Sequence, residues 1–132
     1  MLAEWEFPWP PTATNRMYRV GRQGHIHIDE KALLWKNAVK AMVHLSRVEV
    51  PKGQHLSLWI FQYPPPGWKG DTDGMFKLIQ DAVFLGLDAN DYWVSENHNY
   101  RGAPCGTIQE AKVVVRLGLA EWKEIGEVMS RG

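Results

Sequence analysis

The stretch KGDTDGMFKLIQDAVFLGLDAND, residues 69–91, decides the fold because it contains both the acidic residues and the most regular helix pattern of the chain. Its apolar residues recur at the three-to-four spacing of one buried helical face: Met75, Leu78, Ile79, Ala82 and Val83. We expect Gly86 to end this helix. Asp71 and Asp73 stand where a Pro/Gly-rich loop meets the helix, and Asp91 opens the next segment. Folding is expected to bring these three carboxylates together.

The acidic set of Asp71, Asp73 and Asp91 suits a hard divalent cation. Two carboxylates about 4 Å apart repel by roughly 4 kcal/mol at an effective dielectric of about 20, so a cluster of three requires neutralisation. Mg²⁺, or Mn²⁺ in its place, takes oxygen ligands and commonly uses one or two carboxylates together with substrate phosphate. Lys77 lies one helical turn after Asp73, where its ammonium can bind a phosphate or partly neutralise the carboxylates. The sequence has no Cys/His set at zinc-binding spacing.

The same residues have a structural interpretation. Asp-x-Asp before a helix is common, because aspartate caps free N–H groups and suits the positive end of the helix. Lys77 and Asp81 then form a surface ion pair. An EF-hand loop is excluded, since Phe76 and Ala82 stand where that loop needs Gly and Glu. Spacing alone leaves the metal site and the capped helix as alternatives.

Two blocks of the sequence resemble one known family. The first block contains, in order, Asp71-x-Asp73, Lys77, Asp81-Ala82 and an acidic couplet that ends in Asp91. The second is FPWPP at residues 7–11, followed by Asn15 and Tyr18. Both are similar to the RusA family of Holliday junction endodeoxyribonucleases. The resemblance implies a metal-dependent homodimeric resolvase that cuts four-way DNA junctions in recombination and repair, with Asp71, Asp73, Asp91 and Lys77 as its catalytic residues.

Three positions depart from the family pattern. Gly74 stands where the family has Asn, Asn90 replaces the first Asp of the couplet, and Trp93 replaces a Gln. The three carboxylates remain, but Gly74 lacks a side chain that could orient a ligand or water. A branched-DNA-binding protein that does not cut is therefore the alternative function. A transferase that holds a nucleotide diphosphate through Asp-x-Asp is a further one, although the sequence shows no sugar-nucleotide pocket.

Composition indicates an ordinary globular chain. Its 132 residues, 45% hydrophobic and 23% charged, predict a single domain over residues 1–132. The single cysteine, Cys105, excludes an intramolecular disulfide, and the sequence has neither a signal-peptide pattern nor an apolar run of membrane-spanning length. We therefore expect a cytoplasmic protein with no membrane partner and no organic cofactor.

Charge is distributed unevenly although the formal net charge is zero. Residues 1–70 contain nine Lys/Arg and five Asp/Glu, whereas residues 71–132 contain six and ten. A basic surface that faces an acidic metal site would suit a phosphodiester backbone. Chance, together with an acidic C-terminal helix, explains the same asymmetry.

Candidate DNA contacts lie in basic, polar loops. The sequence YRVGRQGHIHI, residues 18–28, predicts a small hairpin with Gly21 and Gly24 at its turn. Arginine contacts phosphate, and tyrosine stacks on unpaired bases. The predicted nucleic-acid-binding residues are Asn15, Arg16, Tyr18, Arg19, Lys69 and Arg101. A solvated loop, and for Arg101 a plain turn cation, are the alternatives. Among the seven tryptophans, Trp9, Trp68 and Trp93 are the candidates for DNA or dimer contacts.

The rest of the chain predicts a scaffold of strands and helices. We expect a strand at 4–7, a helix from a cap at Asp29 to about Ser46, a strand covered on both faces at 55–62, a hairpin of strands at 92–100 and 107–117, and a helix after 119. The first helix is expected to bury Ala32, Trp35, Val39 and Met42. The predicted fold is a compact α+β domain, a mixed β-sheet flanked by helices, in strand-helix-strand-helix-strand-strand-helix order.

Overall fold

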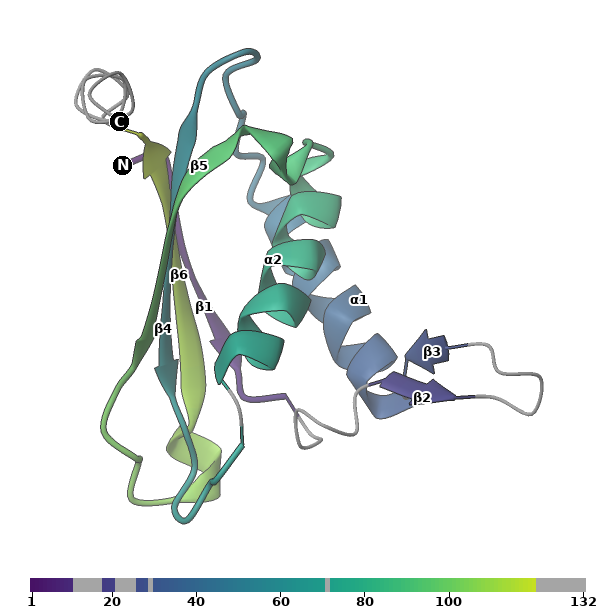
Figure 1. Cartoon of the computed structure of the whole chain (residues 1–132), viewed down its shortest axis with the longest axis vertical. Helices are drawn as coiled ribbons and strands as arrows, with labels where there is room; N and C mark the ends of the chain where they lie inside the picture. Colours follow the sequence, from purple (N-terminus) through teal and green to yellow (C-terminus); the bar gives the residue numbers. More distant parts are fainter. Residues whose placement is uncertain (11–17, 21–25, 29, 71, 121–132) are drawn as a thin grey trace, which may run out of the picture.

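A computed structural model describes residues 1–10, 18–20, 26–28, 30–70 and 72–120. The fold is a small α+β domain, as predicted, in which two helices cover one face of a four-stranded mixed sheet (Figure 1). The elements are β1 (Ala3–Pro8), β2 (Tyr18–Val20), β3 (Ile26–Ile28), α1 (Glu30–Leu45), β4 (Leu56–Tyr63), α2 (Thr72–Leu87), the short 3₁₀ turn η2 (Asp91–Trp93), β5 (Val94–Arg101), η3 (Ile108–Glu110) and β6 (Lys112–Leu119). The helix predicted after residue 119 lies mostly outside the described residues.

The strand order of the main sheet is β1-β6-β4-β5. β6 runs antiparallel to both of its neighbours, whereas β4 and β5 are parallel and are joined by the crossover helix α2. The predicted hairpin of residues 92–100 with 107–117 is therefore wrong, because β4 lies between these two strands. The polar sequence of β5, VSENHNYR, suits an edge strand, whereas the apolar β4 takes the centre of the sheet.

The core lies between one face of the sheet and the two helices. The strands supply alternate residues to it, and the helices supply one stripe each. Its main members are Trp5, Phe7, Trp35, Val39, Val43, Leu56, Leu58, Ile60, Met75, Leu78, Ile79, Val83, Val113, Val115 and Leu117. The burial predicted for α2 is confirmed. In α1, Val43 takes the buried position predicted for Met42, whose side chain is 45% exposed, because Val43 is the residue four positions after Val39.

The two helices run in the same direction and pack closely. Residues 48–53, which follow α1, and residues 87–90, at the end of α2, line one hollow, so both helices end on the same side of the molecule. A Cβ atom on Gly86 would lie 2.6 Å from the Lys40 carbonyl oxygen and 2.7 Å from the Val43 Cβ. Gly86 thus allows the helices to approach, and the prediction that it ends α2 is wrong. α2 continues to Leu87, and Asp88 follows with a positive φ of 51°.

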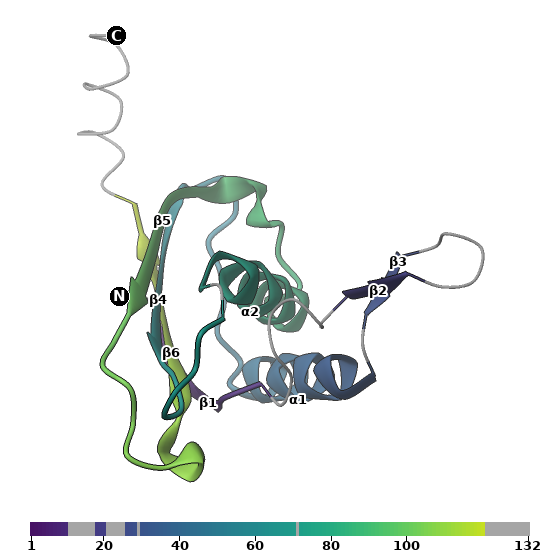
Figure 2. The ribbon, with the colours of Figure 1, turned by 60° about the horizontal axis from the view of Figure 1, so that its bottom comes forward.

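Both described helices, α1 and α2, lie on one face of the sheet, and neither covers the opposite face (Figures 1 and 2). Trp59 stacks on His98 with ring centroids 3.7 Å apart, and Phe61 stacks on Tyr100 at 5.3 Å. The Arg116 guanidinium lies over the Phe61 ring and donates a 2.8 Å hydrogen bond to Glu4. The prediction that the β4 strand is covered on both faces is therefore wrong for the single chain, because Trp59 and Phe61 remain partly exposed.

β2 and β3 form a separate antiparallel pair, which confirms the predicted hairpin. Tyr18 is opposite Ile28, and Arg19 is opposite His27. Figure 2 shows this pair beyond the helices, on the side away from the sheet. Its expected turn glycines lie outside the described residues, as does the expected cap of α1 at Asp29. Over the described part of the chain, no helix has the length and apolarity needed to cross a membrane.

Candidate functional site

The start of α2 is held by two amide side chains from neighbouring strands. Gln62, at the end of β4, is fully buried, and its Nε2 donates to the Thr72 carbonyl oxygen at 3.0 Å and to Asn99 Oδ1 at 2.7 Å. Asn99, on β5, donates from Nδ2 to the same Thr72 oxygen at 3.1 Å. Buried hydrogen bonds of this kind fix the backbone that they contact. The peptide between Thr72 and Asp73 is therefore fixed from the parallel strand pair β4 and β5.

Asp73 and Lys77 lie on the exposed side of this fixed backbone. Asp73 is in the first turn of α2, where the helix dipole favours a negative charge, and Lys77 follows one turn later on the same face. Gly74 lies between them without a side chain. Asp71 lies outside the described residues, and its predicted role as a metal ligand stays a prediction.

Asp91 lies beyond the other end of α2, in η2. Gln80 Nε2 is 3.5 Å from Asp91 Oδ2, a long hydrogen bond, and the Asn90 side chain accepts the Tyr92 backbone N–H at 2.9 Å. Asp91 and Asp81 line one hollow together with other residues, among them Lys36 of α1. The neighbours of Asp91 are thus residues from the second half of α2 together with Lys36 of α1.

The structure does not bring Asp91 to Asp73 within one chain. Asp81 is eight residues after Asp73, which corresponds to about 12 Å along the helix axis. Divalent cations bind their oxygen ligands at about 2 Å, so one ion cannot contact carboxylates at that separation. The searched, described residues contain no group of three or more His, Cys, Asp or Glu side chains placed to hold a metal ion. The described acidic residues instead lie at two separate places, with Asp73 in the first turn of α2 and Asp81 and Asp91 near and beyond its other end.

Trp68 holds the loop before α2 in place through contacts with Trp9 and Arg101. The Trp68 ring packs edge-on against Trp9 at 5.1 Å, and the Arg101 guanidinium lies 5.1 Å from the ring centroid of Trp68. Arg101 Nη2 also donates a 2.9 Å hydrogen bond to the Trp68 carbonyl oxygen. A Cβ atom on Gly70 would lie 2.4 Å from the Trp68 ring, so this position requires glycine. Arg101 therefore stabilises the loop on which Lys69 is exposed, and its own side chain also remains exposed.

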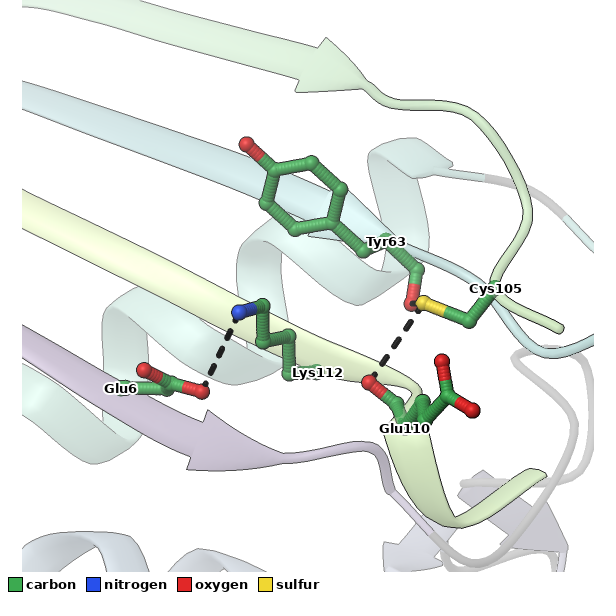
Figure 3. A network of polar contacts seen from close by, with 5 residues as sticks. All are labelled: Glu6, Tyr63, Cys105, Glu110 and Lys112. Atoms are coloured by element: carbon green, nitrogen blue, oxygen red, sulfur yellow. Dashed lines mark hydrogen bonds and ion pairs between the residues drawn. The ribbon is translucent and has the colours of Figure 1, made fainter. Parts of the chain in front are cut away.

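The loop that follows Arg101 is tied to the end of β4. Gly102 N donates to the Gln62 carbonyl oxygen at 2.7 Å, and Cys105 N donates to the Pro64 carbonyl oxygen at 2.9 Å. Figure 3 shows the Cys105 thiol between the carbonyl oxygens of Tyr63 and Glu110, at 3.8 and 3.4 Å. These contacts join the ends of β4 and β5, and so they help to fix Arg101 beside Trp68.

The remaining predicted DNA contacts are not tested by the structure. Asn15 and Arg16 lie outside the described residues. Tyr18 and Arg19 belong to β2, of which only the backbone is described. A role for these four residues in binding DNA stays a prediction.

Sequence reasoning missed Gln62 and Asn99. A signal for Gln62 was present, because it continues the inward alternation of Leu56, Leu58 and Ile60 along β4. A polar side chain at such a position needs a hydrogen-bonding partner inside the protein. Its Oε1 atom is buried, with no hydrogen-bond partner in the described part of the chain. Gln80 and Lys36 are the neighbours of Asp91. Nothing in the sequence except their spacing on the helices predicted that they would lie near it.

Neither the protein-family models nor the curated proteins include a match to this chain. The resemblance to the RusA family therefore rests on the two sequence blocks quoted above.

Proposed function

We propose that the protein is a Mg²⁺-dependent, structure-specific endodeoxyribonuclease that resolves four-way DNA junctions. The observation that carries this proposal is the fixed start of α2, where two buried amide groups hold the Thr72 carbonyl directly before Asp73. Catalytic carboxylates need a backbone that does not move when charge changes around them. A simple helix cap on the surface would not need two partners from two strands.

The residues at this end of α2 fit a hard divalent cation. Asp71 and Asp73 supply carboxylate oxygens, and Mg²⁺ commonly needs only one or two protein carboxylates beside water and substrate phosphate. Mn²⁺ takes the same ligands. When bound, such a cation makes a coordinated water more acidic and stabilises negative charge on the phosphoryl group.

The chain's own residues orient the substrate around this pair. Gln62 and Asn99 keep the Thr72–Asp73 peptide in place, and Lys77 offers an ammonium to the phosphate one turn later. Lys69, on the loop before α2, and Arg101, at the end of β5, are placed to contact neighbouring phosphates. In the hydrolysis, a water oxygen bonds to phosphorus while the P–O3′ bond breaks, and the 3′ oxygen takes a proton. The products are a 5′-phosphate and a 3′-hydroxyl.

In this proposal, the homodimer is needed to supply Asp91 to the site. Within one chain, Asp91 neighbours Asp81 and lies away from Asp73. A site that contains all three predicted carboxylates therefore requires Asp91 from a second chain. Two chains related by a twofold axis would then form two such sites, which suits paired cuts in a four-way junction.

A second candidate is a protein that binds branched DNA without cutting it. Two observations favour it: Gly74 offers no side chain beside Asp73, and Asp91 lies away from Asp73 in the single chain. Lys69 and Arg101 would serve such a protein equally well as contacts to DNA phosphates. Cleavage decides between the two candidates.

The test is cleavage of a labelled synthetic four-way junction and of a matching linear duplex, each with Mg²⁺, Mn²⁺ or EDTA. We expect paired nicks in the junction alone, only with metal, and a loss of about a thousandfold or more in rate with Asp73→Asn, which removes a proposed ligand. Asp88→Asn is the matched control, because it changes the same charge just after α2 and asparagine tolerates the positive φ found there. Binding without cleavage under every condition would replace the nuclease with the non-cleaving binder.

A further inference from the structure

The face of the sheet that α1 and α2 leave open has a hollow beside the end of β6. Its volume is about 620 Å³, and it is lined by Gly118 of β6 and Ser57 of β4, which lie opposite each other in the sheet. Because these positions carry little or no side chain, the surface of the sheet is low there. Trp59 forms a fixed wall, since its Nε1 donates to Ser57 Oγ at 2.7 Å and its ring stacks on His98. Leu119, 50% exposed, lines the hollow as well.

The chain leaves the sheet at the edge of this hollow. Leu119 is the last residue of β6, and the Ala120 backbone N–H donates to the His55 carbonyl oxygen at 3.0 Å. Residues 121–132, which lie outside the described residues, follow directly. As a helix they would extend for about 18 Å, at about 1.5 Å per residue. Four residues of a strand span about 13 Å, so the segment is long enough to cover the hollow and the side chains beside it.

The sequence of this C-terminal segment has an apolar stripe. Trp122, Ile125 and Met129 are spaced three and four residues apart, which places them on one face of a helix, whereas Glu124 and Glu127 belong to the other face. A helix of this length is marginal in water by itself, so burial of its stripe decides whether it forms. α1 and α2 already cover one face of the sheet (Figure 2). The open face is the apolar surface that begins where the segment begins.

We propose that residues 121–132 fold back over the open face of their own sheet. Trp122 would enter the hollow beside Trp59, and the rest of the stripe would cover Phe61 and Tyr100. The rings of Phe61 and Tyr100 are stacked on each other at 5.3 Å, so they offer a preformed aromatic surface. The sheet would then be covered on both faces, as in other layered folds. The proposal does not depend on the nuclease function.

Charge and attachment favour this occupant over others. Arg116 and Lys112, the cations that β6 places on the open face, are paired with Glu4 and Glu6 of β1 at 2.8 and 3.4 Å. A nucleic acid needs cations for its phosphates, and these two are already neutralised. A segment joined through a short linker acts at an effective concentration of about millimolar, which favours it over a second molecule at micromolar concentration.

The first test is the rate of tryptic cleavage after Lys123 in the folded, full-length protein, followed by mass spectrometry at about 1 and 100 µM protein. A docked helix is cleaved only when it opens locally. We therefore expect cleavage at least about tenfold slower than in a synthetic peptide of residues 119–132, where nothing can dock. The rate should be the same at both protein concentrations, because the docking is within one chain.

Gly118→Leu tests the hollow itself. A Cβ atom on Gly118 would have its nearest atom, the Met1 Cα, at 3.8 Å, so a leucine there fills the hollow without disturbing the core. Trp59→Ala removes the wall instead. Each change should make cleavage after Lys123 about tenfold faster, because it undocks the segment. Leu34→Ala, which alters an exposed side chain of α1, is the matched control and should leave the rate unchanged. Urea denaturation checks that each variant is folded.

Cleavage as fast as in the peptide would overturn the proposal, and so would a rate that does not change in Gly118→Leu or Trp59→Ala. Protection that grows with protein concentration would indicate that a second copy covers the face, which would overturn it as well.

A second test measures the placement directly by NMR. A nitroxide is attached to Glu127→Cys in a Cys105→Ser background, on the side of the segment away from its stripe. We expect it to broaden the indole signal of Trp59, which is identified by its loss in Trp59→Ala. The same label on Leu34→Cys, on the outer side of α1, should broaden this signal far less. A signal that stays sharp with the Glu127→Cys label, or broadening that passes from a labelled molecule to an unlabelled one, would overturn the proposal.

Discussion

At its first turn, α2 carries Asp73 on a backbone that Gln62 and Asn99 hold from inside the protein, whereas beyond its end Asp91 accepts a long hydrogen bond of 3.5 Å from the partly exposed Gln80 amide. Both ends have an aspartate, Asp73 in the first turn of the helix and Asp91 in η2 just beyond its last turn. They differ in what fixes the backbone: buried hydrogen bonds at the start, and a short solvent-exposed cap at the end. Buried groups hold a geometry against solvent, while exposed hydrogen bonds exchange readily with water. The backbone at the start of α2 is therefore held in one geometry by buried hydrogen bonds, whereas the backbone after its end is held only by contacts that water can replace.

The largest effect is expected when the two ends are inactivated in different chains. The site proposed above takes Asp73 from one chain and Asp91 from the other, so it is complete only in a dimer. We predict that Asp73→Asn and Asp91→Asn each abolish junction cleavage, and that mixing the two inactive proteins restores single nicks. Half of the mixed dimers' sites would then contain both aspartates. The measurement is nicking of the labelled junction after subunit exchange.

Asp73→Asn mixed with Asp71→Asn is the control, because both changes affect the same end and no intact site forms. Recovery in the control mixture, or none in the first mixture while both proteins still dimerise, would contradict a site shared between chains.

The next largest effect concerns the contact between the helices near their ends. We expect Gly86→Ala to lower the free energy of unfolding by about 2–3 kcal/mol, because its Cβ would meet the Lys40 carbonyl oxygen and the Val43 side chain. Urea denaturation measures it. Gly118→Ala is the matched control, since its Cβ would have its nearest atom, the Met1 Cα, at 3.8 Å. A stabilised Gly86→Ala protein, the usual result for a glycine inside a helix, would mean that the helices are less closely packed than described.

A smaller change in the free energy of unfolding compares a buried amide, Gln62, with an exposed one, Gln80. Gln62→Leu should destabilise the protein by about 1–2 kcal/mol, because it leaves Asn99 Oδ1 without its partner and removes one bond to Thr72. Gln80→Leu, which removes the long exposed contact to Asp91, should change stability by less than about 0.5 kcal/mol. Equal effects in urea denaturation would remove the distinction between the two ends of α2. A double-mutant cycle of Gln62→Leu with Asn99→Ala should show coupling of about 1 kcal/mol.

The smallest effect is the stability of Asp73→Asn without metal. Asp73 is exposed and stands in the first turn, so loss of its charge should lower stability by about 0.3–1 kcal/mol through the helix dipole. Convergence of three carboxylates in one chain would give the opposite sign, since the substitution would then relieve repulsion. Thermal unfolding in EDTA distinguishes the two, and a raised melting temperature would contradict the separation of Asp73 from Asp91 described above.

Local patterns in the sequence predict much of this fold. The alternation of Trp5 and Phe7, the buried stripe of α2 and the short β2–β3 hairpin all follow from periodicity and turn residues, and each is confirmed. These features depend on neighbours within a few residues. The start of the candidate site was found in the same way, from Asp-x-Asp before an amphipathic helix.

The features that the sequence did not predict depend on distant parts of the chain. Whether β6 pairs with β5 or with β4 is decided by which strand is apolar enough for the centre of the sheet, and adjacency in sequence favoured the wrong choice. Asp91 follows α2 closely in sequence, but the length of the helix separates it from Asp73. Gly86 looked like a stop signal because its contact with Lys40 and Val43 is made across two helices.

The common direction of α1 and α2 has an electrostatic consequence. Each helix has a partial positive charge of about half a unit at its first turn, and parallel helices add these fields at one side of the molecule instead of cancelling them. Lys69 and Arg101 stand at this side too, since β4 and β5 both end there. At this side of the molecule the helix ends and the two cations attract a polyanion, and the carboxylates of Glu30 and Asp73 in the first turns of the same helices oppose them. A cation bound at Asp73 would shift that balance toward attraction.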